Sequence, residues 1–461
     1  MTNIETSFEP LKLSDRIQSL DIMRGIVLFG ILLMNINGMG LAHGAYGDPT
    51  IAGGAAEWDL YTWITTNMFF EGTMRALFSL LFGVGMYVLL DRLEKKGAGI
   101  NAANIYFRRL TWMLVFGLIH GYLLLWVGEI LYDYALMGFL VFSFRNMAPK
   151  KLIIIAAILI SAGAFWNYMD YKKDIKWVEQ VAMVNTYKAE GKPLTKELKE
   201  ADDKWQSREA KRSPEAVKEN NTNMHKGYFQ VVGFLAPRNT EYNEEDPYRY
   251  GPFDVLSLML LGIALFKLNV LSAKKSYRFY FIMALVGYSI GLGINYYEVT
   301  TIINSNFSFL GFSKSNLTYD AGRVPVAMGH IAAIMLLCKL PVLQWLKMRL
   351  AAVGKMALTN YIMHSVIAMF VFTGVGFGMF GKLQRHELLY VVFSIWIFQL
   401  IISPIWLKYF HFGPVEWLWR NLSYQKMHAF RKTKLVQSNT MDIPNEVIVV
   451  PVLNDSNSPT S

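Results

Sequence analysis

The amino-acid sequence predicts an all-α protein, a polytopic transmembrane helical bundle of about ten spans. Two observations lead to this fold class. Of the 461 residues, 53% are hydrophobic and only 17% are charged, against about 25% charged in an ordinary soluble domain. The hydrophobic residues also gather in long runs, each close to the roughly 20 residues that a helix needs to cross the hydrocarbon core. A water-soluble globular fold is therefore not expected.

Apolar windows of spanning length recur along the whole chain. They cover residues 22–41, 73–91, 108–127, 130–147, 151–169, 253–270, 278–297, 323–340, 353–376 and 388–409. Several contain closely spaced glycines, as at Gly83 and Gly85, or at Gly287, Gly291 and Gly293. Small residues let helices approach closely in lipid, so we expect tight helix pairs at these positions.

The basic residues predict the orientation of the bundle. The net charge of +10 would raise the question of a nucleic-acid partner in a soluble protein. Here Lys and Arg fall in every second connection between the apolar windows and in the C-terminal part, while the opposite short connections are acidic or nearly uncharged. Cytoplasmic loops retain Lys and Arg, so both termini are expected in the cytoplasm of a bacterial inner-membrane protein, with the lipid bilayer as partner and no nucleic acid.

Four regions follow from this pattern. Residues 1–169 form an N-terminal membrane part of five spans, and residues 251–424 form a C-terminal membrane part of five more. Between them, residues 170–250 are polar and predict one extracytoplasmic, partly helical insert, because long loops translocate largely regardless of charge. Residues 425–461 predict a cytoplasmic disordered tail. The N-terminus carries early acidic residues and no basic n-region, so we expect no cleaved signal peptide.

One further segment is predicted to lie along the membrane surface. Residues 56–70 contain Trp58, Tyr61 and Trp63 among polar residues. Aromatic residues at helical spacing on a partly polar segment are typical of an amphipathic helix in the membrane interface.

Several chemistries have no support in the sequence. Cys338 is the single cysteine and lies in an apolar run, which leaves no disulfide or second thiolate ligand, and no metal is expected. The chain has no phosphate-binding Gly-x-x-x-x-Gly-Lys-Ser/Thr loop, no Gly-x-Ser-x-Gly elbow and no His-Glu-x-x-His motif. ATP-driven transport, serine hydrolysis of the elbow type and zinc proteolysis are therefore unsupported.

Ionisable residues within or beside the apolar windows are the functional candidates, because burying them in lipid is costly. His120 lies about 9 Å, at helical rise, before Trp126 at the outer end of its window. Glu129 and Asp133 follow one helical turn apart and are expected on the same helical face. A histidine beside carboxylates can act as a general base, so these three residues are the catalytic candidates. The alternative is that His120 only hydrogen-bonds a neighbouring helix.

A second polar group is predicted to bind substrate near the outer face. Glu71 and Arg75 are four residues apart and are expected to pair with each other, although Arg75 is also suited to an anionic substrate group. Arg323 and His330 lie seven residues apart on one helix face, so they either line a cavity or anchor the helix at the interface. Asn360 is a further substrate-binding candidate, with helix–helix hydrogen bonding as the alternative.

Basic residues on the opposite side are candidates for binding a cofactor. Arg24 begins the first span, and Arg108 with Arg109 begins the third. Topology and snorkelling account for all three, while a phosphate-bearing donor would use the same charges. His43, in the loop after the first span, and His364, beside Asn360, are weaker candidates.

Several stretches resemble the YeiB family of multi-spanning bacterial inner-membrane proteins, catalogued as domain of unknown function 418. The resemblance rests on residues 16–25 with 30–36, 71–85, 108–110, 117–120, 125–131, 357–361 and 413–420. It implies the ten-span fold and favours His120, Glu129 and Arg75 as site residues. The family pattern usually has Asp where this chain has Glu129, which keeps the carboxylate, and Gln where it has His364, which weakens a role for that histidine.

A shorter match, Leu20-Asp21-x-x-Arg24-Gly25 with Asn35, is similar to transmembrane acyltransferases of the heparan-glucosaminide acetyltransferase kind. This similarity implies transfer of an acyl group from a cytoplasmic acyl-coenzyme A to an extracytoplasmic acceptor, a small molecule or an envelope glycan. Arg24, Arg108 and Arg109 would then meet donor phosphates.

Two main functions remain open at this stage, beside a binding or scaffold role through the extracytoplasmic insert. Acyl transfer uses the buried histidine beside carboxylates together with the donor-side arginines. Transport of a small metabolite or ion, coupled to protons through His and Glu, is the alternative. Carriers often show paired interrupted spans, and none is visible in the sequence. The sequence does not indicate an oligomeric state.

Overall fold

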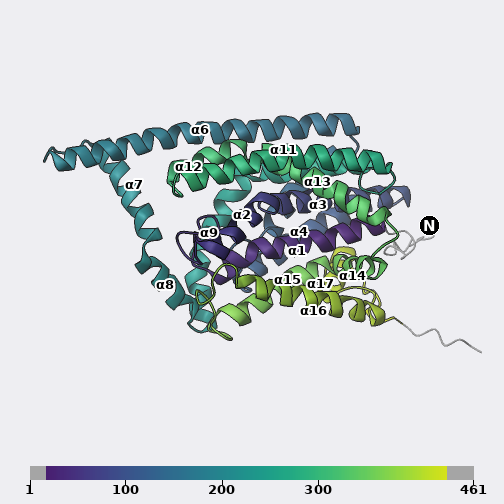
Figure 1. The fold of residues 1–461 in the computed structure, drawn as a ribbon. Helices are drawn as coiled ribbons and strands as arrows, with labels where there is room; N and C mark the ends of the chain where they lie inside the picture. The colour runs from purple at the N-terminus through teal and green to yellow at the C-terminus, as the bar shows by residue number, and fades with distance from the viewer. Residues whose placement is uncertain (1–16, 433–461) are drawn as a thin grey trace, which may run out of the picture.

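The computed structural model describes residues 17–432, without the side chains of residues 245–249. In this part of the chain helices are joined by loops, and there is no β-strand. Its principal helices, in order, are α1 (Gln18–Gly40), α2 (Glu57–Phe69), α3 (Thr73–Lys95), α4 (Ile100–Tyr122), α5 (Leu131–Phe144), α6 (Pro149–Ala189), α7 (Lys196–Arg212), α8 (Pro214–Met224), α9 (Tyr228–Arg249), η2 (Gly251–Leu256), α10 (Ser257–Lys267), α11 (Tyr277–Asn304), α12 (Phe309–Ser315), α13 (Tyr319–Lys339), α14 (Gln344–Lys355), α15 (Ala357–Phe372), α16 (Leu388–Tyr409) and α17 (Pro414–Tyr424). Most of them run side by side along one direction (Figure 1).

The described helices include six segments long and apolar enough to cross a membrane, and a seventh if α14 and α15, bent by 81° at their junction, are one span. The predicted windows 108–127, 130–147 and 253–270 fall outside this set. They coincide with α4, with the 14-residue α5, and with the π-helix η2 plus the 11-residue α10. The protein is therefore a multi-pass membrane protein, but the count of ten spans is not confirmed.

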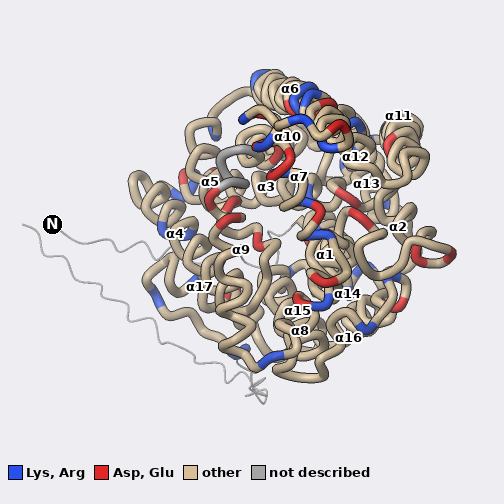
Figure 2. The backbone as a smooth tube through the Cα atoms, turned by 90° about the vertical axis from the view of Figure 1, so that its left-hand side faces the viewer, with Lys and Arg blue, Asp and Glu red and all other residues tan. Residues whose placement is uncertain are grey.

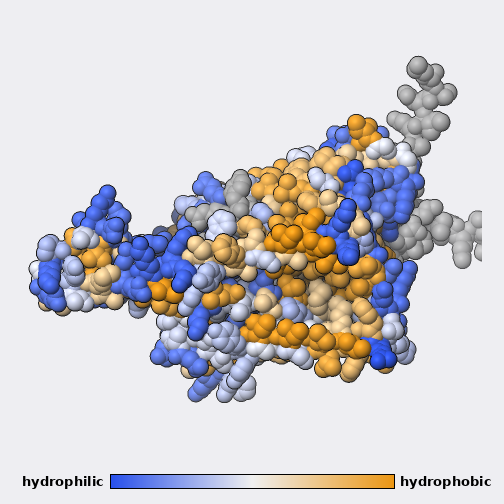
Figure 3. Space-filling model, turned by 90° about the horizontal axis from the view of Figure 1, so that it is seen from above, coloured by the Kyte–Doolittle hydropathy of each residue, from blue (hydrophilic) through white to orange (hydrophobic). Residues whose placement is uncertain are grey.

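Outward-facing apolar residues mark the surface that meets lipid. Figure 3 shows a broad hydrophobic band across the bundle, with hydrophilic residues at its right-hand end and along the part that projects at the left. Large apolar side chains on the outer helices stay exposed, among them Ile158 on α6, Phe281 on α11 and Ile397 on α16. Exposed apolar surface on this scale is typical of a membrane-facing surface rather than of a soluble monomer.

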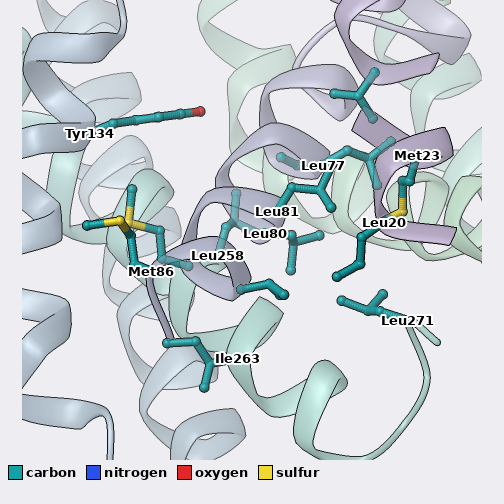
Figure 4. Packing of buried hydrophobic residues seen from close by; sticks show 14 of the residues in the cluster. Leu20, Met23, Leu77, Leu80, Leu81, Met86, Tyr134, Leu258, Ile263 and Leu271 are labelled. Atoms are coloured by element: carbon teal, nitrogen blue, oxygen red, sulfur yellow. The ribbon is translucent and has the colours of Figure 1, made fainter. Parts of the chain in front are cut away.

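The two N-terminal spanning helices form the centre of the bundle. In the apolar window of α1, 83% of the residues are buried, against 17% for α6 and 22% for α11. Leucines of α3 interlock with Leu20 and Met23 of α1 and with Leu258 and Ile263 of α10 in the main core (Figure 4). α1 and α3 run through this core, and their opposite ends line the two cavities described below.

Two glycines allow α3 and α10 to cross in contact. A Cβ atom at Gly83 would lie 2.3 Å from the carbonyl oxygen of Met259, and one at Gly262 would lie 2.2 Å from that of Leu80. Gly287 and Gly291 likewise face the backbone of α13, so close packing is confirmed at three of the predicted glycines. Gly293 meets no atom within 4 Å, and Gly85 faces a cavity.

We expect Gly83→Ala to lower the midpoint of thermal unfolding in detergent by several degrees, because the added methyl would push α3 away from α10, a cost of about 1–3 kcal/mol. Gly293→Ala is the matched control, since it adds the same group to a spanning helix where there is room. Tryptophan fluorescence during heating measures both. Equal shifts in the two variants would contradict the packing argument.

The predicted insert is continuous with a spanning helix. α6 runs for 41 residues, about 60 Å at helical rise and twice the hydrocarbon thickness, so the expected boundary near residue 170 falls inside it. Its far end contacts α7 through the aromatic rings of Trp177 and Trp205, which pack edge to face. The Lys188 ammonium lies 2.6 Å from Asp202 and lowers the pKa of that carboxyl.

The last helix of this segment returns to the bundle. On α9, the Asn239 amide donates to the Gly121 carbonyl at 2.9 Å, and the Tyr228 hydroxyl donates to the Leu123 carbonyl at 2.7 Å. α7 and α8 lie at one end of the bundle, opposite α14 and α17 (Figure 1). The insert therefore covers the end where α4 terminates, while its extracytoplasmic location stays a prediction.

Two other segments complete the fold. α2 confirms the predicted helix at 56–70 and is amphipathic, with Trp58 exposed and Trp63 buried. In the predicted tail, residues 425–432 fold back along α16, where His411 donates its backbone N–H to Phe430. The rest of that tail, residues 433–461, lies outside the described residues.

Candidate functional site

His120 lies in the last turn of α4 and is fully buried. Its Nδ1 is 3.3 Å from Glu129 Oε1, and its Nε2 is 2.7 Å from the hydroxyl oxygen of Ser365 on α15. The ring packs edge-on against Tyr361, with centroids 4.9 Å apart. The structure thus brings His120 and Glu129 together, as the sequence predicts.

Glu129 is held by the start of α5. Its two carboxylate oxygens accept the backbone N–H groups of Leu131 at 2.6 Å and Tyr132 at 2.9 Å. Such N–H groups have no partner inside the helix, and the helix dipole favours a negative charge there. Glu129 therefore precedes α5 instead of sharing a helical face with Asp133, and that detail of the prediction is wrong. Gly117 makes room for this arrangement, since a Cβ there would lie 2.6 Å from Glu129 Oε2.

Asp133 lies apart from the histidine. It is buried on α5 and lines a cavity that it shares with Asp254 and Asp320. This cavity, cavity 2, has a volume of about 390 Å³. It adjoins cavity 1, which is described below, because both are lined by Arg75, Ile130 and Tyr242. The position of Asp133 suits contact with a ligand and not the orientation of His120.

Helix α15 brings in two residues that sequence reasoning did not assign to the site, Tyr361 and Ser365. The chain bends sharply between α14 and α15, and Glu416 of α17 accepts the backbone N–H groups of Leu358 at 2.7 Å and Thr359 at 3.0 Å. Burial raises the pKa of the Glu416 carboxyl, and its hydrogen bonds from Thr359 and Leu358 oppose that shift. The matched stretches 357–361 and 413–420 therefore meet to fix the start of the helix that faces His120.

Cavity 1 opens at the end of the bundle that the insert covers. Its volume is about 380 Å³, and it is lined by the last turns of α1, the start of α3, Trp126, α9 and Ser365. Its polar lining includes Asn35, His43, Glu71 and Arg75. Size and lining fall in the range of small-molecule sites.

Glu71 and Arg75 join a wider network. Arg75 donates to Asp254 Oδ2 at 2.7 Å and to the Tyr319 hydroxyl at 2.9 Å. The Tyr319 hydroxyl in turn donates to Glu71 at 3.1 Å, and Tyr46 donates to the other Glu71 oxygen at 2.7 Å. The expected contact between Glu71 and Arg75 is thus bridged by Tyr319, because Asp254 of η2 takes the direct ion pair.

A third cavity, cavity 3, lies at the opposite end of the bundle, between the start of α1 and the end of α3, and measures about 480 Å³. Seven basic and two acidic side chains line it: Arg24, Arg92, Lys95, Lys96, Arg109, Lys355 and Arg420, with Asp21 and Glu416. Its deep end is apolar and reaches Leu131 and Tyr361. A basic mouth above an apolar floor suits an amphipathic anion.

The three arginines predicted to bind a cofactor have different environments. Arg24 lines cavity 3 and pairs with Asp21 at 3.0 Å. Arg109 lines it as well, stacked on Trp419 with the guanidinium carbon 3.4 Å from the ring centroid. Arg108 points away from it and donates to the Gln425 side chain at 2.6 Å.

Three other predicted residues lie away from these cavities. Arg323 is buried in an ion pair with Glu298. His330 contacts the Tyr288 hydroxyl at 2.8 Å and the Phe69 carbonyl at 2.9 Å, and Asn360 donates to Ser403 and to the Val353 carbonyl. These contacts favour helix–helix hydrogen bonding for Asn360, and they link Arg323 and His330 to neighbouring helices without placing either at a cavity.

Charged residues lie inside the ring of helices as well as on its rim when the bundle is viewed from the insert end (Figure 2). Among residues 17–432 no group of three His, Cys, Asp or Glu side chains is arranged to hold a metal ion. Sequence reasoning also missed Arg385, which is buried and donates to Asn37 at 3.0 Å and to the Ala45 carbonyl at 2.6 Å. No periodic or motif signal surrounds it, because its partners lie more than 300 residues earlier.

Comparison with known proteins agrees with the resemblance seen in the sequence. The model of a family described as protein of unknown function (DUF418) matches residues 265–426. The uncharacterized protein YxaH of Bacillus subtilis (strain 168) is 28% identical over 445 residues, covering 93% of this chain and 100% of the relative. The uncharacterized protein YeiB of Escherichia coli (strain K12) is 28% identical over 422 residues, covering 89% and 96%. No solved structure matches significantly. The chain is therefore similar over most of its length to YxaH and YeiB, and its C-terminal part matches the DUF418 family model.

Proposed function

We propose that this protein is a transmembrane acyltransferase, which moves an acyl group from a cytoplasmic acyl-coenzyme A to an acceptor on the other side of a bacterial inner membrane. One observation carries the proposal. The buried His120–Glu129 pair lies between two cavities that open at opposite ends of the bundle and differ in charge. The proposal includes ten membrane crossings with both termini in the cytoplasm. Short helices such as α5 and α10 would then cross the membrane packed against longer neighbouring helices.

Cavity 3 is the proposed donor site. Its basic mouth suits the phosphates of coenzyme A, and its apolar floor suits the pantetheine arm and the acyl group. Tyr361 lies at this floor and packs against His120. A thioester bound at this floor would therefore lie close to His120, with Tyr361 between them.

Cavity 1 is the proposed acceptor site. Carboxylate, guanidinium and phenol groups around Glu71, Arg75 and Tyr46 supply both donors and acceptors of hydrogen bonds. Trp126 adds an aromatic face. This lining suits a hydroxyl-rich small molecule or an envelope glycan.

The chemistry assigned to the pair is general base catalysis. Glu129 holds the proton on Nδ1 of His120, which leaves Nε2 free to take a proton from a hydroxyl or amine. The carboxylate then stabilises the imidazolium in surroundings that exclude water. Glu129 is a positioning residue here, because it acts through the histidine.

The test is binding and turnover in lipid discs. Acetyl-coenzyme A is expected to raise the unfolding temperature more than ATP does and to release free thiol slowly, because ligands that bind only the folded state stabilise it. Free coenzyme A should also stabilise without new thiol release. The absence of any shift with acetyl-, propionyl- and succinyl-coenzyme A would sink the proposal.

Transport of a small solute is the second candidate, and two broken helices favour it. The π-helix η2 carries Asp254, and α14 meets α15 at an 81° bend. Carriers place substrates at such breaks, although they usually occur in matching positions of two halves, and both breaks here lie in the second half. Uptake of solute into sealed vesicles without chemical change, lost in Glu129→Gln, would favour this function over acyl transfer.

A further inference from the structure

Ser365, His120 and Glu129 form a chain of three contacting side chains that no sequence motif predicts. The Ser365 hydroxyl oxygen lies 2.7 Å from His120 Nε2, and His120 Nδ1 lies 3.3 Å from Glu129 Oε1. Serine, histidine and carboxylate in this order form a nucleophile, a base and a group that orients the base. All three side chains are at most 3% exposed to solvent.

The Ser365 hydroxyl points in a different direction from several other helical hydroxyls in the protein. Thr62, Thr111, Thr240 and Ser394 each donate to the carbonyl four residues earlier on their own helix. This bond is the usual arrangement for Ser and Thr within helices. The Ser365 hydroxyl instead contacts a histidine on another helix, 245 residues away.

The position of Ser365 also bridges the two proposed substrate sites. Ser365 lines cavity 1, while Tyr361, one turn earlier on the same face of α15, lines cavity 3. The two cavities share no lining residue. One helical turn, about 6 Å, therefore separates the donor floor from the acceptor chamber.

We propose that Ser365 is a nucleophile that carries the acyl group between the two cavities as a covalent ester. This inference rests on the proposed acyl transfer and deepens it, because it assigns a two-step reaction through the enzyme in place of direct transfer. A carrier serine explains how two separate cavities exchange an acyl group without either substrate crossing the membrane.

The first step forms the ester. Ser365 Oγ attacks the thioester carbonyl carbon from the cavity 3 side while His120 Nε2 takes the hydroxyl proton. The carbon–sulfur bond breaks, and the coenzyme A thiolate receives that proton from His120. Acyl-Ser365 and free coenzyme A thiol are the products, and no oxidant or further reactant is needed.

The second step reverses the roles from the other cavity. A hydroxyl or amine of the acceptor in cavity 1 attacks the ester carbonyl and gives its proton to His120. The ester bond to Ser365 breaks, and the serine oxygen takes the proton back. The acceptor leaves acylated and the enzyme returns to its starting state.

Trapping the ester tests the inference. Radiolabelled acetyl-coenzyme A is mixed with the protein in lipid discs without acceptor, quenched in acid, and the label is located by peptide mass spectrometry. Label is expected on Ser365, is lost in Ser365→Ala, and becomes labile to neutral hydroxylamine in Ser365→Cys. Ser403→Ala is the control, since Ser403 is another fully buried serine in a spanning helix and its loss should leave labelling unchanged.

A second measurement needs no donor. A fluorophosphonate probe reacts with activated serines, so it should label wild-type protein at least tenfold more than Ser365→Ala or His120→Gln. Equal labelling of wild type and Ser365→Ala would overturn the nucleophile assignment.

The two measurements separate this inference from the proposed function. Thiol release and acceptor transfer that persist in Ser365→Ala, with no label on the wild-type protein, would establish direct transfer: the proposed function would stand and the inference would fail. Ser365-dependent fluorophosphonate labelling without stabilisation by any acyl-coenzyme A would support the nucleophile and overturn the donor.

Discussion

His120→Gln is expected to lower the rate of acyl transfer by about 10³-fold or more while the protein stays folded. Glutamine fills most of the space of the imidazole and can still hydrogen-bond both Ser365 and Glu129, which are the two partners of the native ring. It cannot accept and return a proton. The loss should therefore appear in kcat, with little change in the KM for acetyl-coenzyme A.

His364→Gln is the matched control for this experiment. It makes the same replacement at another buried histidine on the same helix as Ser365. The Nε2 atom of His364 contacts Gln399 at 3.1 Å. Transfer is expected within about threefold of wild type, and unfolding temperatures of the two variants should agree within a few degrees. Comparable losses in both variants would mean that the base lies elsewhere.

The pairing of His120 with Glu129 could be predicted because both residues lie near one turn of the chain. They are nine residues apart, and the loop formed by residues 123–130 returns the chain toward α4. Six of the ten predicted spans, and a seventh if α14 and α15 are one span, could be located for a similar reason, since apolar length is a local property. Their boundaries could not, because α6 continues in polar sequence and its helix is stabilised by α7 and α12.

The partners that sequence reasoning missed come from distant parts of the chain. Ser365 meets His120, Arg75 meets Asp254, and Arg109 stacks on Trp419 only through helix packing. A short-range pattern predicts the nearest opposite charge, which for Arg75 was Glu71 four residues earlier. Asp254 on the π-helix η2 contacts Arg75 instead. The periodicity of hydrophobic residues in a sequence does not predict a π-helix.

Arg109→Gln is expected to raise the KM for acetyl-coenzyme A by about 10- to 100-fold with little change in kcat, because a charge-assisted hydrogen bond to phosphate contributes about 1.5–3 kcal/mol. Stacking on Trp419 occupies one face of the guanidinium and leaves its N–H donors in the plane, where phosphate binds in bidentate fashion. High salt should weaken donor binding in the wild type and have less effect in the variant.

The neighbouring arginine supplies the control, because it carries the same charge on the same helix but points elsewhere. Arg108 donates to Gln425 and lies outside cavity 3. Arg108→Gln is expected to change the KM less than threefold, with any loss appearing as a lower unfolding temperature. If the two variants raised the KM equally, net positive charge at this end of the bundle would explain donor binding, and cavity 3 would lose its assignment as the donor site.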